Sequence, residues 1–573
     1  MADLFDDYRL GAAWDEMLAG IDRPRAPYHA VHGTLQRLTG EELGNRADTL
    51  ARSYLDQGVT FDVNGEERPF PLDIVPRVIA AHEWTEVETG VAQRVRALEM
   101  FLADVYGPGE AIAAGIIPRR VIVSSSDFMR VAAGIEPPNG VRIHVAGIDL
   151  IRDEEGRFRV LEDNVRIPSG VSYVMANRHA VTTVFPEAFA THRIRPVSEY
   201  PRRLLAALRA AAPSGISDPT VVVLTPGIYN SAYFEHALLA RTMGVELVEG
   251  RDLICAGGRV KMRTTAGETP VDVIYRRVDD EFLDPVQFRA DSQLGCPGLV
   301  NAARAGHVTI ANAVGNGVAD DKLVYTYVPD LVRFYLGEEP ILPNVPTYRL
   351  DEPDDLAYTL AHLEELVVKP VDGAGGKGLV IGPDASKEKL ARLREQVRRD
   401  PRGWIAQPVV MLSTVPTLIN GELQPRHVDL RPFAVNDGNK VWVLPGGLTR
   451  VALPEGQLVV NSSQGGGSKD TWVLSTPLEP ADEVRAREAI PIARVAHMSV
   501  PDRGPDDAPA GEQQQQQQQQ TGTTSTQSQS QSQSQSQSQP QSQLQSQSQP
   551  QSQSQSQPQS QLQSQSQSGS PLC

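Results

Sequence analysis

A glycine-rich loop between two apolar strands is the first feature of this chain with the composition of a phosphate-binding site. The segment LVVKPVDGAGGKGLVI predicts a strand ending at Lys369, then a loop with Gly373, Gly375, Gly376 and Gly378. Glycines let backbone N–H groups approach phosphate oxygens, and the lysine adds a positive charge for the same anion. No GK[ST] sequence opens a helix here, so this is not a Walker loop. Taken alone, the segment also suits a plain glycine-rich hairpin.

Two arginines on later strands extend this basic character. In PRHVDLRPFAV the strand alternation puts Asp429 and Arg431 on one face, and GGLTRVALPEG carries Arg450 on the next strand. An arginine held beside a carboxylate on a strand can clamp a phosphoryl group in transfer. A surface ion pair is the alternative. Downstream, Asn461 opens a polar stretch followed by a second glycine cluster.

The segment RGWIAQPVV predicts an apolar strand interrupted at Gln407-Pro408. Proline removes a donor from the ladder and favours an edge strand. Such an edge can present backbone groups to a planar base, although an ordinary edge strand explains the same pattern.

An acidic hairpin far upstream supplies candidate metal ligands. The segment IDLIRDEEGRFRVLEDNVRIPSG predicts two strands joined by a turn at Asp153–Gly156. Glu162 and Asn164 are two positions apart and share a face, with Asp149 across the hairpin, whereas Asp163 points the other way and is expected to be structural. Three hard oxygen ligands of this kind suit Mg²⁺. A solvated acidic hairpin is the alternative.

The elements that must position these residues belong to two kinds. VETGVAQRVRALEMFLADVYG has helical apolar spacing, whereas VVVLTPG, FEHALLARTMG and VELVEG alternate strand, helix and strand, which predicts a parallel α/β domain. Loops after such strands usually bind ligands. The polar residues there form a predicted set for an amino acid or peptide: Asn230, Ser231, Tyr233, Glu235, Arg276, Arg277 and Asp279. Alternatively, Arg276 and Arg277 pair with Asp279 and Asp280.

Composition narrows the class of protein. The formal net charge of -17 argues against bulk binding to nucleic acid or to an anionic membrane. Three cysteines, Cys255, Cys296 and Cys573, lack zinc-binding spacings and indicate a reducing compartment. The acidic start MADLFDDYRL does not suit a signal peptide, and no apolar run approaches the roughly 20 residues that span a bilayer. We therefore expect a cytoplasmic protein of unknown oligomeric state.

These motifs together resemble the circularly permuted ATP-grasp family, type 2, and more distantly glutathionylspermidine synthetase. In the usual ATP-grasp order the metal motif comes last, whereas here its Asp…Glu-x-Asn pattern comes first. The resemblance runs from about Trp14 to Leu474 and is carried by the following strings: ERPFPLDIVPR, LEDNVRIPSGVSYV, LTPGIYNSAYFEHALLARTMGVELVEGRDL, VDVIYRRVDDEFLDP, VADDKLVYTYVP and VNSSQGGGSKDTWVL.

The resemblance implies an α/β (α+β) fold and a role for each candidate. Lys322 and Lys369 would contact ATP phosphates, and Gly373 to Gly378 would form a mobile lid. Ile405, Ala406, Gln407 and Pro408 would be the adenine hinge. Arg431 and Arg450 would stabilise the transferred phosphoryl group, Asp149, Glu162 and Asn164 would hold Mg²⁺, and Arg166 and Asn461 would complete the site.

The expected organisation has five parts. The Gln/Ser-rich end of the chain, with a glutamine run beginning at Gln513, has too little apolar surface to offset its ordering entropy and is expected to be disordered. The parts are a helical N-terminal region (1–130), permuted metal-binding strands (131–200), a Rossmann-like α/β substrate domain (201–310), the ATP-binding ATP-grasp lobes (311–474) and the tail (475–573).

The implied activity is ATP- and Mg²⁺-dependent joining of a carboxylate to an amine through an acyl phosphate, with release of ADP and phosphate. The substrates would be small molecules or peptides. Two alternatives stay open at this stage: a phosphotransferase that uses the same ATP site, and a nucleotide-binding scaffold without turnover.

Overall fold

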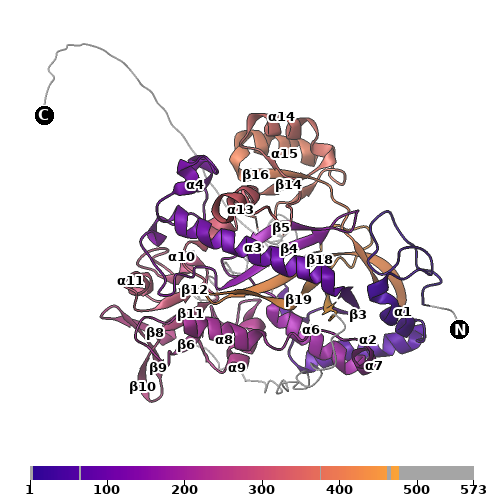
Figure 1. Ribbon diagram of the computed structural model, residues 1–573, viewed down its shortest axis with the longest axis horizontal. Helices are drawn as coiled ribbons and strands as arrows, with labels where there is room; N and C mark the ends of the chain where they lie inside the picture. Colours follow the sequence, from indigo (N-terminus) through magenta and orange to yellow (C-terminus); the bar gives the residue numbers. More distant parts are fainter. Residues whose placement is uncertain (1–3, 64–65, 374–375, 461–465, 476–573) are drawn as a thin grey trace, which may run out of the picture. The chain divides into compact units, whose positions relative to one another are not determined.

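A seven-stranded sheet forms the centre of the computed structural model, which describes residues 4–63, 66–373, 376–460 and 466–475 (Figure 1). Six strands follow the order β3-β20-β19-β18-β4-β5, and β17 pairs with β18. The strands are β3 (Leu72–Ile79), β4 (Val145–Arg152), β5 (Phe158–Asn164), β17 (Thr414–Ile419), β18 (Glu422–Asn436), β19 (Val441–Val451) and β20 (Gly467–Val473). The residues from 476 onward, including nearly all of the predicted disordered tail, lie outside the described part of the chain.

The early hairpin and the late basic strands are neighbours in this sheet. β4 and β5 are antiparallel and connected through the predicted turn at Asp153–Gly156, and β4 also pairs with β18. Segments almost 300 positions apart therefore lie side by side. A sheet requires only that its strands be adjacent in space, so the permuted order is compatible with the architecture.

The two faces of the sheet are covered by different helices. On one face, the long helix α3 (Ala81–Val105) packs against Ile148, Leu150 and Val443; the predicted helical spacing there is confirmed. On the other face, α2 (Gly40–Asp56), α6 (Val171–Val184) and α8 (Tyr200–Ala210) pack against Phe433 and Leu444. The remaining helices of the first 200 residues are short: α1 (His29–Leu35), α4 (Glu110–Ala113), α5 (Arg119–Val123) and α7 (Pro186–Thr191).

The N-terminal region is not only helical, in contrast to the prediction. It contributes a two-stranded hairpin, β1 (Thr60–Val63) with β2 (Glu66–Pro69), and strand β3. The sequence of β3, LDIVPRVI, is buried on both faces and so lacks the alternation that marks a half-exposed strand. β3 pairs in parallel with β20, the last described strand, and closes one side of the main sheet.

The predicted α/β domain is present as a four-stranded parallel sheet in the order β12-β11-β6-β7. A three-stranded antiparallel sheet, β10-β9-β8, accompanies it. The elements are β6 (Val221–Leu224), α9 (Tyr233–Met243), β7 (Glu246–Val248), β8 (Leu253–Ala256), β9 (Arg259–Thr264), β10 (Gly267–Pro270), β11 (Val273–Arg276), α10 (Asp280–Leu283), α11 (Leu299–Arg304) and β12 (Thr309–Ala311).

A smaller lobe carries the glycine-rich loop and has a core of its own, built around Leu363, Val368 and Val397. Its sheet has the order β13-β16-β14-β15. It follows α12 (Lys322–Tyr325) and α13 (Val328–Leu336) and comprises β13 (Tyr348–Arg349), α14 (Pro353–Ala361), β14 (Leu366–Pro370), β15 (Val380–Ile381), α15 (Lys387–Arg399) and β16 (Trp404–Pro408).

The prediction of an edge strand around Pro408 is wrong, because β16 lies between β13 and β14. The reason is local. β13 pairs only with Ile405 and Ala406, so Gln407 and Pro408 have a partner strand on the β14 side alone. A proline is tolerated at that end, where β13 requires no donor from it. Within the described part of the chain, no helix combines the length and apolar character needed to cross a bilayer.

Candidate active site

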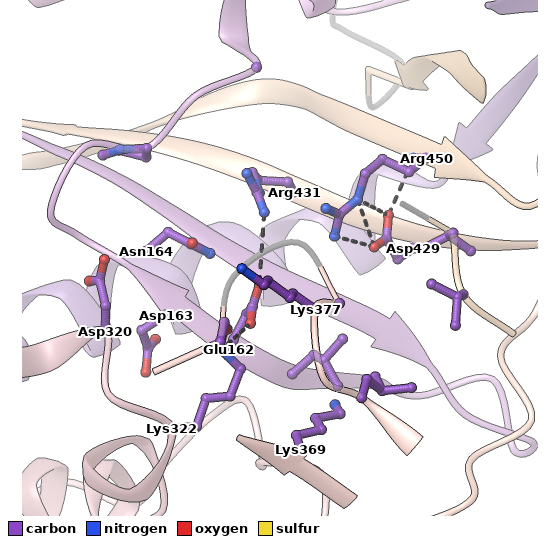
Figure 2. A pocket seen from close by; sticks show the side chains of 18 of the residues that line it. Glu162, Asp163, Asn164, Asp320, Lys322, Lys369, Lys377, Asp429, Arg431 and Arg450 are labelled. Carbon is purple, nitrogen blue, oxygen red and sulfur yellow. Dashed lines mark hydrogen bonds and ion pairs between the residues drawn. The ribbon is translucent and has the colours of Figure 1, made fainter. Parts of the chain in front are cut away.

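One cavity of about 350 Å³ is lined by residues of the main sheet, the small lobe and the α/β domain (Figure 2). The sheet contributes Glu162 of β5, Arg431 of β18 and Arg450 of β19; the small lobe contributes Lys369 of β14; and the α/β domain contributes Arg277. The volume suits a small ligand. The structure therefore brings the early acidic hairpin and the late basic strands to a single pocket.

Opposite charges are in contact where these elements meet. Lys322 Nζ lies 3.3 Å from Glu162 Oε2 and donates to the Gly373 carbonyl at 2.6 Å. Arg431 Nη2 lies 3.9 Å from Glu162 Oε1. Lys369 Nζ donates to Gln407 Oε1 at 2.7 Å. Lys322, Lys369 and Arg431, three of the predicted phosphate-binding residues, thus point into the same space as Glu162.

Asp149 is held by both strand arginines instead of facing the cavity. Its carboxylate accepts from Arg431 Nη2 at 2.7 Å and from Arg450 Nη2 at 2.6 Å, it is fully buried, and it does not line the pocket. Arg450 also contacts Asp429, the carboxylate that the sequence placed on the same strand face as Arg431. Gly147 leaves room for the Arg431 side chain, because a Cβ there would lie 3.3 Å from Arg431 Cδ, closer than an ordinary contact. Metal binding by Asp149 would therefore require the arginines to release it.

Glu162 and Asn164 are better placed as metal ligands, since both line the pocket. A bulge in the β4–β5 ladder next to Glu162 leaves Leu161 without a partner, and such bulges re-aim neighbouring side chains. Burial alone would raise the pKa of Glu162, but the charges of Lys322, Arg431, Arg450 and Lys369 lower it to about 2. The carboxylate is therefore ionised at neutral pH. Asp163 also borders the cavity, but its carboxylate is buried against Arg94 at 2.6 Å, which agrees with the structural role expected from the alternation.

The donor set fits Mg²⁺ only in part. No cluster of three or more His, Cys, Asp or Glu side chains suited to a metal occurs among the described residues. However, Mg²⁺ usually keeps several waters and binds through one or two carboxylates together with substrate phosphates. Glu162, with Asn164 beside it, meets that smaller requirement.

Two of the four residues of the predicted adenine hinge line the cavity. Gln407 and Pro408 line the pocket together with Val409 and Val410, whereas Ile405 and Ala406 are buried in the small lobe and do not line it. Apolar side chains complete this end of the cavity: Ile151, Leu161, Val345, Val367, Leu379, Ile381 and Leu412. This apolar lining suits the ring of a base.

The glycine loop reaches the pocket at two of its four predicted positions. Gly373 and Gly376 line the cavity, whereas Gly378 does not, and Gly375 lies outside the described residues, as does Asn461. A Cβ at Gly373 would lie 2.6 Å from Pro370 Cγ, so a side chain there would displace the loop. Lys377, which the sequence interpretation did not select, also lines the pocket from this loop (Figure 2).

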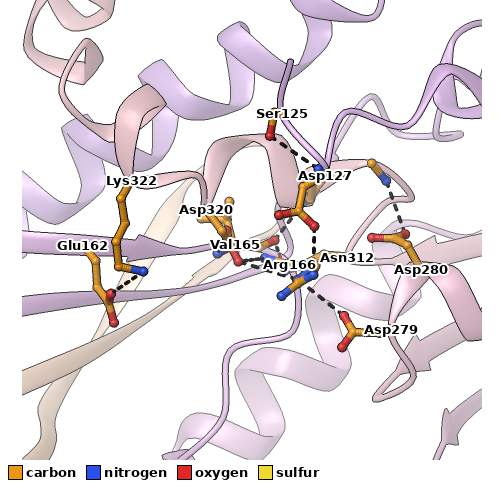
Figure 3. Close-up of polar contacts among 12 residues, drawn as sticks. Ser125, Asp127, Glu162, Val165, Arg166, Asp279, Asp280, Asn312, Asp320 and Lys322 are labelled. Carbon is orange, nitrogen blue, oxygen red and sulfur yellow. Dashed lines mark hydrogen bonds and ion pairs between the residues drawn. The ribbon is translucent and has the colours of Figure 1, made fainter. Parts of the chain in front are cut away.

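Arg166 differs from the other arginines because carboxylates surround it (Figure 3). It lies 3.0 Å from Asp127, 3.3 Å from Asp279 and 4.0 Å from Asp320, and it lines the pocket with Asp127 and Asp320. Burial raises the pKa of Asp127 to about 6 and that of Asp320 to about 7, although the Arg166 charge opposes both shifts. The prediction of a phosphate-binding arginine here did not anticipate these acidic partners.

Only three of the seven predicted substrate residues line the cavity: Asn230, Ser231 and Arg277. Glu235 is fully buried and accepts from Ser169 Oγ and Gly170 N, both at 2.7 Å. It therefore holds the loop before α6. Tyr233, in the first turn of α9, and Asp279, which pairs with Arg166, do not line the cavity either.

The two adjacent arginines of the α/β domain have different surroundings. Arg276 is fully buried, pairs with Asp280 at 3.1 Å and donates to the carbonyls of Asn312 and Ala313, so the structure removes it from the predicted substrate set. Arg277 lines the cavity and pairs with Glu235 at 3.2 Å. The predicted alternative is confirmed for Arg276, which pairs with Asp280.

Comparison with known proteins identifies the family to which this chain belongs. Residues 76–452 match the family described as circularly permuted ATP-grasp type 2, and the chain belongs to that family. The resemblance inferred from the motifs and the predicted fold class are confirmed.

Three relatives illustrate the range of similarity. A protein of Mycobacterium tuberculosis (strain H37Rv) is 62% identical over 476 residues, which cover 83% of this chain and 86% of that protein. One of Synechocystis sp. (strain PCC 6803) is 52% identical and is covered over 98% of its length, against 82% of this chain. A protein of Frankia casuarinae named "Putative glutamate--cysteine ligase 2-2" is 47% identical over 80% of this chain, which spans only 53% of that relative.

Proposed function

We propose that this protein is an ATP- and Mg²⁺-dependent ligase that joins a carboxylate to an amine through an acyl phosphate. One observation carries the proposal: Glu162 of the early hairpin contacts both Lys322 and Arg431, and all three line the same pocket as Lys369. An ionised carboxylate among several cations, beside an apolar slot, is the arrangement that a magnesium nucleotide requires.

The roles of individual residues follow from their positions. Lys322 and Lys369 bind the phosphates, and the apolar lining near Gln407 takes the adenine. Arg431 and Arg450, fixed by Asp149 and Asp429, neutralise charge that develops on the transferred phosphoryl group. Glu162 and Asn164 hold Mg²⁺, which when bound neutralises phosphate oxygens. Because no covalent nucleophile is needed, catalysis consists of positioning and charge neutralisation.

The other end of the cavity is proposed to hold the substrates to be joined. Asn230, Ser231 and Arg277 are polar groups from the α/β domain that reach this end. The carboxylates of Asp127 and Asp320 favour a cation, and an amine in its ammonium form is such a cation. The Frankia relative is named as a ligase of glutamate and cysteine, two amino acids, and such a pair would supply one carboxylate and one amine.

The test is a hydroxylamine trap with candidate amino acids as carboxylate donors. A ligase yields a hydroxamate together with ADP, because hydroxylamine intercepts the acyl phosphate. A stable phosphoester would identify a phosphotransferase instead, and ATP binding without any substrate-stimulated phosphate release would identify a scaffold.

The variant Glu162→Gln connects this activity to the site. Loss of a metal-binding carboxylate is expected to lower kcat at least about 100-fold while the melting temperature stays near that of the wild type. The matched control is Glu339→Gln, since the Glu339 side chain is 80% exposed and pairs only with Arg333 among the described contacts. ATP turnover by the Glu162 variant at the rate of the control would rule out the metal role.

A further inference from the structure

Two cysteines that the proposed reaction does not use lie next to one another in the α/β domain. Cys255 on β8 and Cys296 in the loop before α11 are 41 positions apart, and their Sγ atoms are 3.5 Å apart. Cys296 is buried, whereas Cys255 is half-buried. A thiol pair at this separation needs to close by only about 1.5 Å to reach the S–S bond length of about 2.05 Å.

The backbone around the pair is closely packed. Cys296 N–H donates to the Leu283 carbonyl at 3.0 Å. A Cβ at Gly295 would lie 2.0 Å from that same carbonyl oxygen, and a Cβ at Gly250 would lie 2.3 Å from the Gly295 carbonyl oxygen. The two glycines therefore let the loop fit tightly between α10 and the segment before β8. This fit holds Cys296 in front of Cys255, so the thiols meet without a large rearrangement.

We propose that Cys255 and Cys296 form a redox-active dithiol that closes to an intramolecular disulfide when it meets a low-molecular-weight disulfide. Cys255, the more accessible of the two, attacks one sulfur of the small disulfide R–S–S–R and releases the first thiolate. Cys296 then attacks the Cys255 sulfur of the mixed disulfide and releases the second. The two protons of the protein thiols pass to the two leaving thiolates, so the products are one protein disulfide and two R–SH.

Accessibility and position, not acidity, favour Cys296 as the second nucleophile. In the reduced pair the hydrogen bond from Cys255 lowers the pKa of the Cys296 thiol and raises the pKa of the Cys255 thiol. This hydrogen bond is lost once Cys255 is in the mixed disulfide, because the sulfur then carries no proton. Buried Cys296 is therefore suited to ring closure by its place in front of Cys255 and not to the first encounter with an oxidant.

A disulfide between Cys255 and Cys296 would close a ring around the part of the α/β domain that lines the cavity. The ring between Cys255 and Cys296 contains β11, Arg277 and α10. Arg277 lines the cavity, and Asp279, at the start of α10, contacts Arg166 at 3.3 Å. A disulfide that closes a ring of this size restricts the unfolded chain and stabilises the folded one. The oxidation state of the two cysteines would therefore affect the rigidity of the segment that carries Arg277.

The experiment uses the full chain with Cys573 replaced by serine, so that only the pair reacts. Incubation with oxidised glutathione is expected to remove both thiols, yield a peptide cross-link between Cys255 and Cys296, and raise the unfolding midpoint by about 5 °C, reversibly on reduction. Accumulation of a glutathione adduct on Cys255 without closure would overturn the proposal. So would resistance of both thiols to oxidation in the folded protein.

Single variants distinguish the two thiols. In Cys296→Ser the adduct on Cys255 is expected to persist, because the second nucleophile is missing. In Cys255→Ser the buried Cys296 is expected to react at least about tenfold more slowly than Cys255 does. Equal reaction rates of the two single variants would contradict the assigned order. Because none of these measurements requires ATP or substrate, the outcome is independent of the proposed ligase activity.

Discussion

Both ends of the cavity contain arginine, but the charged side chains around the arginines differ. At the end near the glycine loop, Arg431 and Arg450 lie with Lys322, Lys369 and Lys377 close to the carboxylates of Asp149, Glu162 and Asp429, and Asp372 also lines the cavity. At the other end, Arg166 is surrounded by the carboxylates of Asp127, Asp279 and Asp320, and Arg277 pairs with Glu235.

The comparison shows that an arginine does not by itself define an anion site. The cations near Lys369 favour a polyphosphate, whereas the carboxylates around Arg166 offset its charge and make that end less favourable for one. A single cavity of this kind separates a nucleotide from a cationic substrate by charge. Removing charges at each end in turn tests this difference.

The largest expected effect follows from Lys369→Met. Loss of a charge-assisted contact to phosphate, worth about 1.5–3 kcal/mol, is expected to weaken ATP binding about 10- to 150-fold. Isothermal titration with ATP and Mg²⁺ measures this change. Lys387→Met, at an exposed position on α15 of the same lobe, is the control and should bind normally. An unchanged affinity in the Lys369 variant would remove that lysine from the nucleotide site.

A second, smaller effect is the pH dependence of ATP affinity. Burial lowers the pKa of Lys369 to about 8, and Lys322 acts in the same direction while Glu162 opposes it. The side chain is therefore charged below pH 8 and loses its charge as the pH rises through that value. ATP is expected to bind about tenfold more weakly at pH 9 than at pH 7.

Lys369→Arg is the matched control for this titration, since arginine keeps its charge throughout the range. Its ATP affinity should change little between pH 7 and pH 9. If the wild type also showed a flat profile, the lowered pKa would play no part in nucleotide binding.

The smallest effect is expected from Arg166→Gln. Since Asp127, Asp279 and Asp320 already offset the Arg166 charge, ATP affinity should change less than about threefold. Arg431→Gln is the matched variant at the other end and should weaken binding by more than tenfold. Equal losses in the two variants, measured by the same titration, would show that the ends do not differ as their charges indicate.

Local patterns were sufficient to predict part of this site. The strand alternation separated Glu162, which contacts Lys322 and Arg431, from Asp163, whose carboxylate pairs with Arg94 although the residue also borders the cavity. The glycine loop after Lys369 and the placing of Asp429 and Arg431 on one face of a strand were also readable, because each depends on residues close together in sequence.

Long-range partners were not predictable in the same way. The contacts of Asp149 depend on β18 lying beside β4, since Arg431 is 282 positions away. Asp127 comes from a loop in a region predicted to be helical and meets Arg166 only in the fold. Arg276 and Arg277 are adjacent and identical, so only their position at the end of β11 decides which one is buried against Asp280.

The pairing of β3 with β20 has a consequence for how this protein is made. A ribosome releases the chain from its N-terminus, yet the partner that covers β3 is the last described strand of the sheet. Until Val473 emerges, the nascent chain holds an apolar strand whose backbone groups lack their native partner, a condition that invites association between chains. Because of the permuted order, the main sheet can be completed only after β20, its last described strand, has been translated.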